Sequence, residues 1–132
     1  MDGVATDRRV ESHEGINARH LENSAIAGRQ FDLIVADVSF ISLTLLLPQL
    51  PRFLTRLGDL LLLVKPQFEA RASEVPAGGV VTDPAVRARA GAEIADFLNA
   101  AGFSTRPLGD CPVPGATGNV ELLLHARDRK ST

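Results

Sequence analysis

The chain has 132 residues, of which 45% are hydrophobic and 23% are charged, values typical of a globular domain with a single core. Its net charge of −2 gives no overall basic character, so the composition does not itself indicate a nucleic-acid partner, although a local basic patch could still bind RNA. The single cysteine, Cys111, excludes an intrachain disulfide and suits a reducing compartment.

The first residues lack the apolar segment of a secretory signal, and the longest apolar run, Leu60–Val64, is too short to span a membrane. We therefore expect a cytoplasmic protein that is not inserted in a membrane. The polar residues 1–9 are expected to be disordered.

The first half of the chain predicts two strands and two helices. Val10–Ser12 is a candidate for a short strand, and Asn17–Ala27 has apolar residues at helical spacing. Phe31–Val38 is a mostly apolar run with β-branched residues, which is typical of a strand buried on both faces. Ser39–Leu57 is then predicted to be a helix that Pro48 and Pro51 break or kink and that ends at Gly58.

The second half predicts a further buried strand over Asp59–Val64 and a loop over Gln67–Thr82. The clearest helix of the chain begins with Asp83 as the N-cap and Pro84 in the first turn, and Gly102 ends it. Two more strands are expected, over Phe103–Leu108 and Val120–Ala126.

Strands and helices alternate along most of the chain, and this order predicts an α/β fold with a mainly parallel sheet. The last two strands are joined by a loop, so the C-terminal strand can pair antiparallel. In open α/β sheets, binding sites form beyond the carboxyl ends of the strands. Asp37 and Lys65 both stand at such ends, on strands that we expect to be neighbours.

Asp37, Lys65 and Glu121 are the candidate catalytic residues. Each also has a plain structural interpretation: a helix cap for Asp37, a lysine that reaches solvent for Lys65, and an edge-facing charge for Glu121. Together they form a candidate proton-handling cluster. A lysine can act as the base for a weak nucleophile such as a ribose hydroxyl, provided that a second cation or desolvation offsets the carboxylates that favour its charged form.

Other patterns argue against common alternatives. The chain contains no G-x-G-x-x-G, P-loop, C-x-x-C or H-E-x-x-H motif. His13, His20 and His125 lack metal-ligand spacing, so no metal site is predicted. A hydrolase built on Ser39 or Ser42 is disfavoured because no nucleophile-elbow motif surrounds either serine.

A family resemblance rests on five ordered stretches, which read RVESHEGINARHL, FDLIVADVSFISL, LLLVKPQFEA, GGVVTDP and PVPGATGNVELLL. In order and spacing they resemble the TlyA-type ribosomal-RNA 2′-O-methyltransferases, which belong to the FtsJ-like class and are also labelled hemolysin A. The resemblance covers about residues 9–127. It implies a partial Rossmann-like class I methyltransferase fold, S-adenosylmethionine as cofactor, and ribosomal RNA or a ribosomal subunit as partner.

The resemblance also implies roles for individual residues. The family uses a Lys-Asp-Lys-Glu tetrad, and the match places its aspartate at Asp37, its second lysine at Lys65 and its glutamate at Glu121. Lys65 would take the hydroxyl proton, and the two acids would position it. Asn17 falls in the adenosyl-contacting loop, so Asn17 and Asp37 are the implied cofactor contacts. The substrate side would be lined by Gln67, Phe68, Glu69 and the Gly78–Val81 loop.

Several parts of the family pattern have no match in the sequence: the small RNA-binding domain, the first two strands with their glycine-rich cofactor loop and ribose-binding acid, and the first lysine of the tetrad. No segment before Arg9 supplies them. We therefore expect residues 1–132 to form a single, truncated methyltransferase domain, corresponding to the C-terminal part of the catalytic domain.

The missing strands affect the edge of the sheet. The parent fold has the strand order 3-2-1-4-5-7-6, so their absence leaves the Phe31–Val38 strand with an open apolar edge, and open edges favour pairing between chains. Two interpretations therefore stay open. The chain is a fragment of a methyltransferase, or it is a catalytically inactive module that oligomerises through this edge.

Overall fold

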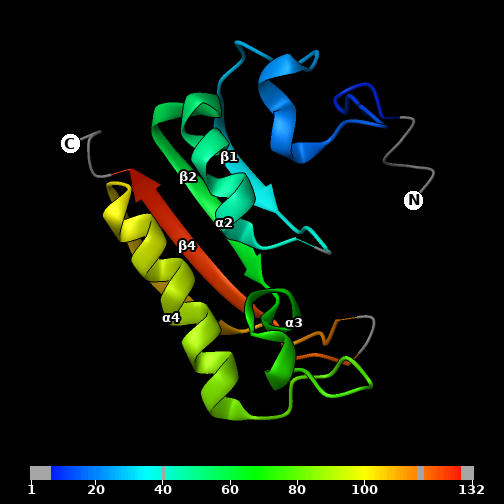
Figure 1. The fold of residues 1–132 in the computed structure, drawn as a ribbon. Coiled ribbons are helices and arrows are strands. Elements are labelled where there is room, and N and C mark those ends of the chain that lie inside the picture. Colours follow the sequence, from blue (N-terminus) through cyan, green and yellow to red (C-terminus); the bar gives the residue numbers. More distant parts are fainter. Residues whose placement is uncertain (1–6, 40, 116–117, 129–132) are drawn as a thin grey trace.

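The computed structural model describes residues 7–39, 41–115 and 118–128, and it contains a four-stranded sheet in the order β1-β2-β4-β3 (Figure 1). β1 pairs parallel with β2, whereas β4 pairs antiparallel with both β2 and β3. Three strands thus run in one direction and the C-terminal strand runs against them, which confirms the predicted α/β class. The strands span Phe31–Ala36 (β1), Leu54–Val64 (β2), Phe103–Asp110 (β3) and Leu122–Asp128 (β4).

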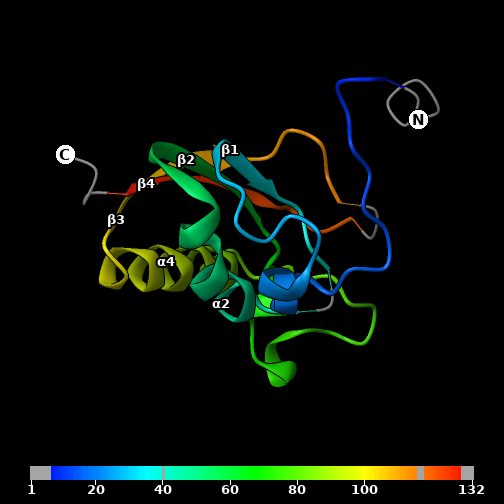
Figure 2. The ribbon, with the colours of Figure 1, turned by 90° about the horizontal axis from the view of Figure 1, so that it is seen from above.

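The helical segments gather on one side of the sheet, where α4 and α2 lie below the strands in Figure 2. Among the described residues, no helix combines the length and the apolar character that a membrane span requires. The segments are η1 (Ala18–Asn23), α2 (Leu43–Leu46), η2 (Leu47–Phe53), α3 (Pro66–Glu69), η3 (Ala72–Glu74) and α4 (Pro84–Ala100).

The longest helix, α4, forms where its end signals predict it. The Asp83 side chain accepts a hydrogen bond from the Ala85 backbone N–H at 2.9 Å, and Pro84 occupies the first helical position. Gly102, with a φ of +99°, follows the last turn in the left-handed region that favours glycine. The prediction for this helix is confirmed.

The core lies between α4 and one face of the sheet. Leu60, Leu62 and Val64 of β2 have no exposed surface, and they cluster with Ile94 and Leu98 of α4. Because side chains alternate across a strand, the opposite set faces away from this core. On β1, Leu33 is 57% exposed and Val35 is 62% exposed, so the prediction that Phe31–Val38 is buried on both faces is wrong for the described structure.

The connection between β1 and β2 also differs from its prediction. Ser39–Leu57 was expected to be one helix, but only the short α2 and η2 are helical, and Leu54–Leu57 already belongs to β2. Two prolines, at positions 48 and 51, explain the short helices, because proline removes a backbone donor. Gly58 lies inside β2, where a Cβ would stand 2.9 Å from Leu54 Cδ2, so close packing accounts for this glycine.

Three smaller predictions need correction or lie partly outside the described residues. Val10–Ser12 forms no strand, and Asn17–Ala27 contains only the 3-10 helix η1. The predicted loop Gln67–Thr82 includes most of α3 and all of η3. The expectation of disorder concerns residues 1–9, of which 1–6 lie outside the described structure.

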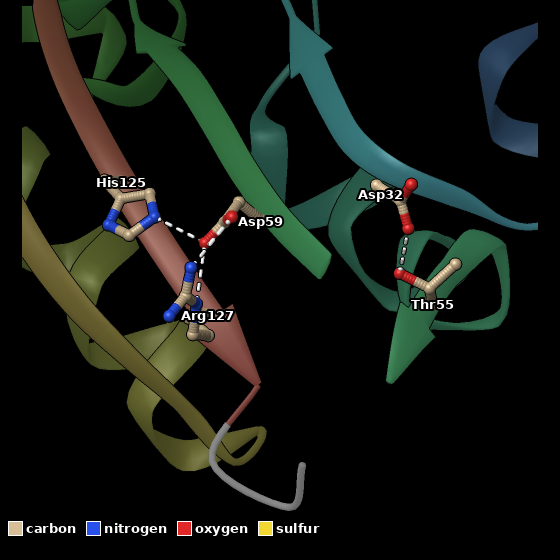
Figure 3. A network of polar contacts seen from close by, with 5 residues as sticks. All are labelled: Asp32, Thr55, Asp59, His125 and Arg127. Atoms are coloured by element: carbon tan, nitrogen blue, oxygen red, sulfur yellow. Dashed lines mark hydrogen bonds and ion pairs between the residues drawn. The ribbon is translucent and has the colours of Figure 1, made fainter. Parts of the chain in front are cut away.

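A polar network ties β2 to β4 on the face of the sheet that α4 leaves uncovered (Figure 3). Asp59 Oδ1 lies 2.8 Å from both His125 Nε2 and Arg127 Nε, and Asp59 Oδ2 accepts from Arg127 Nη2 at 3.1 Å. The hydrogen bond from Arg127, and then that from His125, lowers the pKa of Asp59 from its usual 3.8 to about 2. The network therefore stabilises the folded chain when Asp59 is ionised.

We predict that Asp59→Asn lowers the free energy of unfolding by about 1 kcal/mol at pH 7, a modest value because the network is partly exposed to solvent. Because the folded pKa lies below the unfolded one, this difference should persist above about pH 4 and vanish as the pH falls toward 2. Urea unfolding at a series of pH values measures it. Asp32→Asn is the matched control, since Asp32 accepts only from Thr55 Oγ1 in Figure 3. A pH-independent difference would contradict this account.

Candidate functional site

The candidate catalytic residues meet at one end of the sheet. Asp37 follows β1 and Lys65 follows β2. Because these two strands are parallel, both residues lie at the same end of the sheet. Glu121 precedes β4, which starts at this edge because it runs antiparallel to β2 (Figure 1). Lys65 Nζ lies 2.5 Å from Asp37 Oδ1 and 3.8 Å from Glu121 Oε2. Three residues far apart in the sequence thus form one charged cluster.

The lysine is the inner member of this cluster. Its side chain is 12% exposed, compared with 7% for Glu121 and 62% for Asp37. Lys65 Nζ also donates a hydrogen bond to Ser39 Oγ at 3.1 Å. A nearly buried ammonium group is costly without partners, and here two carboxylates and a hydroxyl group surround it. The cluster can hold and exchange a proton at one fixed nitrogen, with Asp37 on its exposed side.

The Glu121 carboxylate is held against the backbone of the loop that precedes β4. A Cβ at Gly115 would lie 2.9 Å from Glu121 Oε2 and 3.1 Å from its Cδ, so a larger residue at position 115 would displace the carboxylate or the loop. The Cys111 backbone N–H donates to the Glu121 carbonyl oxygen at 2.7 Å. The loop therefore restricts where Glu121 can point.

Glu69 has a role that its sequence position did not indicate. The resemblance places it on the substrate side, whereas in the structure it fastens the chain after Lys65 to the chain after Asp37. Its carboxylate accepts from Ser42 Oγ at 2.5 Å and from the Leu43 backbone N–H at 2.8 Å, at the first turn of α2. Burial is the main cause that raises the pKa of Glu69.

Asn119 is a second residue that sequence analysis missed. It is completely buried, its Oδ1 accepts from the Val81 backbone N–H at 2.8 Å, and its Nδ2 donates to the Gly79 carbonyl at 2.9 Å. It thereby joins the predicted substrate loop to the chain two residues before Glu121. The only sequence signal is a polar residue between Gly118 and Val120 at the start of an apolar strand.

Asn17 is not joined to the Lys65 cluster. Its side chain caps η1 by accepting from the Arg19 backbone N–H at 2.9 Å. η1 in turn is fastened to η2, where the Leu21 backbone N–H donates to Gln49 Oε1 at 3.1 Å. Contact between Asn17 and a cofactor therefore stays a prediction.

Two other expectations can be placed in the described structure. Within residues 7–39, 41–115 and 118–128, no group of three or more His, Cys, Asp or Glu side chains is arranged to hold a metal ion. On the predicted substrate side, Gln67 Oε1 is buried and has no hydrogen-bond partner among the described residues.

The fold is an α/β sheet with a lysine–carboxylate cluster at one end of its strands. The chain belongs to the FtsJ-like methyltransferase family, whose sequence pattern matches residues 2–128. The chain is 46% identical over 124 residues to the 16S/23S rRNA (cytidine-2′-O)-methyltransferase TlyA of Mycobacterium tuberculosis, a match that covers 94% of this chain and 46% of that protein. Hemolysin A of Brachyspira hyodysenteriae is 34% identical, with 92% of this chain and 51% of that protein covered.

A solved structure from Streptococcus thermophilus has the same fold, with a TM-score of 0.87 and 34% identity over 97% of this chain and 46% of the other. The TlyA-type resemblance and the partial Rossmann-like fold are thereby confirmed. The chain spans about half the length of the curated relatives that it matches.

We predict that Glu69→Ala destabilises the fold by about 1–3 kcal/mol, because it leaves a buried backbone N–H and a hydroxyl group without their acceptor. Glu69→Gln keeps an oxygen for the Leu43 N–H and adds a donor that can reach Ser42, so its loss should be clearly smaller. Urea unfolding of the two variants measures the difference. Equal losses would show that the fastening of α2 does not depend on these hydrogen bonds.

Proposed function

We propose that this chain carries the base and the positioning carboxylates of a ribosomal-RNA ribose 2′-O-methyltransferase. The observation that supports the proposal is the nearly buried Lys65 Nζ, 2.5 Å from Asp37 and 3.8 Å from Glu121, at the edge of the sheet where α/β enzymes bind their ligands. The name of the Mycobacterium tuberculosis relative supports the substrate class.

In the proposed reaction, Lys65 Nζ would take the proton of a ribose 2′-hydroxyl while the hydroxyl oxygen bonds to the methyl carbon of the donor. The bond between that carbon and the sulfonium sulfur would break, and the donor would leave as a neutral thioether. Asp37 and Glu121 hold the amine in place and stabilise the ammonium ion that forms, so their effect increases as the proton moves. The same carboxylates oppose the neutral amine that the reaction requires. A neighbouring positive charge, such as a sulfonium, offsets this opposition.

The chemistry of the site fits part of S-adenosylmethionine, which supplies the methyl group when bound. Asp37 presents a carboxylate that is 62% exposed, and a carboxylate suits the positively charged end of this cofactor. Gln67 Oε1, buried without a partner among the described residues, offers a further acceptor. The fit is partial, because the chain contains no glycine-rich G-x-G-x-x-G loop for the remainder of the cofactor.

Isothermal titration with S-adenosylmethionine, followed by transfer of labelled methyl groups to ribosomal RNA, tests the proposal. We predict that Lys65→Met lowers the transfer rate about 10²–10⁴-fold, the usual contribution of a general base. Lys130→Met is the matched control, because positions 65 and 130 hold the only lysines of the sequence. Asp37→Asn and Glu121→Gln should lower the rate less than Lys65→Met does.

The same substitutions should be made in a chimera in which this chain replaces the matching part of the Mycobacterium tuberculosis relative. The chimera separates two kinds of failure. If the chain alone gives no heat at millimolar S-adenosylmethionine while the chimera methylates RNA, the chain has the base but does not bind the cofactor alone. Full activity of the Lys65→Met chimera would overturn the assignment of the base.

The exposed edge of β1 favours a second candidate, a module that self-associates through this strand. Leu33 and Val35 are more than half exposed on β1. Among the described residues, β1 pairs with β2 and has no strand on its other side. The two candidates are compatible, because Asp37 lies beyond the end of β1, so pairing along β1 leaves it in the cluster.

We predict that light scattering detects a dimer of this chain, and that Val35→Lys shifts it to the monomer by placing a charge on the edge strand. Leu57→Lys is the matched control, because Leu57 is 63% exposed and Val35 is 62% exposed. A monomeric wild-type chain at high concentration, or equal effects of both substitutions, would remove the support for pairing through β1.

A further inference from the structure

We propose that Asn119 and Gly115 are positioning residues that clamp the Glu121 carboxylate against Lys65 and couple it to the loop Gly79–Val81. The clamp acts on the proposed base, so its catalytic meaning rests on the proposed function. Its geometry, however, can be measured without methyl transfer.

Asn119 forms the centre of the clamp. Its fully buried amide group uses its oxygen for the Val81 N–H and its nitrogen for the Gly79 carbonyl, at 2.8 Å and 2.9 Å. Its own backbone carbonyl accepts from the Gly115 N–H at 3.0 Å. Two separate segments, the Gly79–Val81 loop and the chain at Gly115, thus bond to one residue. An asparagine suits this place because donor and acceptor are both required, and a buried group left without its partner is costly.

Gly115 leaves the space in which the Glu121 carboxylate lies. The space for its absent Cβ is occupied by the Glu121 carboxylate, whose Oε2 would be only 2.9 Å away. The Gly118 N–H donates to the Gly115 carbonyl at 2.9 Å, so Gly115 is bonded to the residue before Asn119 as well as to Asn119 itself. The Glu121 oxygen that lies against Gly115 is also the one 3.8 Å from Lys65 Nζ.

The position of Glu121 matters because its carboxylate is not hydrogen-bonded to Lys65, so the distance between the two groups can change. At 3.8 Å the two charged groups attract each other without a hydrogen bond to fix the separation, so the electrostatic interaction varies with each displacement of the carboxylate. The side chains are 7% and 12% exposed, and solvent screens them little. A small movement of Glu121 would therefore change the electrostatic interaction at Lys65, the proposed base.

The clamp also extends to the predicted substrate side. Val81 is 1% exposed, and the Arg87 side chain donates to the Thr82 carbonyl at 3.3 Å, so the loop is anchored beyond Asn119 as well. Because Asn119 bonds to this loop and stands two residues before Glu121, a displacement of the loop is transmitted to the catalytic carboxylate. RNA that contacts Gly79–Val81 would thereby adjust the cluster.

The first experiment measures acetylation of Lys65 by acetic anhydride, with Lys130 as the internal reference, because the sequence holds no other lysine. Gly115→Ala should raise the labelling rate of Lys65 about fivefold, since it pushes Glu121 away from the amine and opens the cluster. Ser104→Ala is the control, because Ser104 is exposed on β3 and pairs with Arg127 at the end of the sheet away from Glu121, and its labelling should equal that of the wild type. Wild-type labelling of Gly115→Ala would overturn the role of Gly115.

The second experiment measures amide hydrogen exchange at Val81. Asn119→Ala removes the acceptor of this N–H and should speed its exchange about tenfold, whereas Asn119→Asp keeps the acceptor oxygen and should retain most of the protection. Exchange in α4 reports global stability, so the Val81 rate should rise by more than the α4 rate does. If Asn119→Ala frees Val81 but leaves Lys65 labelling at the wild-type rate, Asn119 only supports the fold, and the proposed coupling is wrong.

In the active chimera, substitutions at positions 115 and 119 should change the kinetic constants differently. Gly115→Ala should lower kcat by displacing the carboxylate, whereas Asn119→Ala should lower kcat and also raise KM for RNA, because it releases the loop as well. An unchanged KM for RNA in Asn119→Ala would contradict the coupling to the loop. If Lys65→Met is fully active while labelling and exchange respond as expected, the clamp exists and the proposed function fails.

Discussion

The burial of one positive charge determines how the site is built. Lys65 lies at the end of the most buried strand, and its amine is nearly removed from solvent, so the fold must supply partners for it. They come from the ends of the two strands that neighbour β2, namely Asp37 beyond β1 and Glu121 ahead of β4. Ser39 adds a hydroxyl acceptor, and Gly115 gives the second carboxylate room to approach. The order of the strands therefore brings both carboxylates to Lys65.

The parts of the fold that sequence analysis predicted are those set by local signals. α4 has a capping aspartate, a proline in its first turn and a terminal glycine, and each signal acts within a few residues. The apolar runs before Asp37 and Lys65 likewise showed where two strands end, and hence that the two charges share an edge. Ser39–Leu57 was mispredicted because its leucine spacing fits a helix, whereas pairing with β1 extends β2 to Leu54.

The supporting residues of the site could not be predicted because their partners are distant in sequence. Asn119 bonds to residues 38 and 40 positions earlier, and Glu69 bonds to residues 27 and 26 positions earlier. Neither residue belongs to a motif whose spacing indicates such a contact. The family resemblance located the charged trio, but it did not indicate that Glu69 bonds to the first turn of α2. Only the folded chain shows which polar residues hold others in place.

Three strands of the sheet hold the proton-handling cluster. Asp37 follows β1, Lys65 follows β2 and Glu121 precedes β4, and β2 pairs with both of the other strands. This chain spans about half the length of its curated relatives. Preorganised charges lower a reaction barrier only if they are fixed before substrate arrives. Lys65, Asp37 and Glu121 lie at the ends of paired strands, so the sheet holds these three charges in place before a substrate binds.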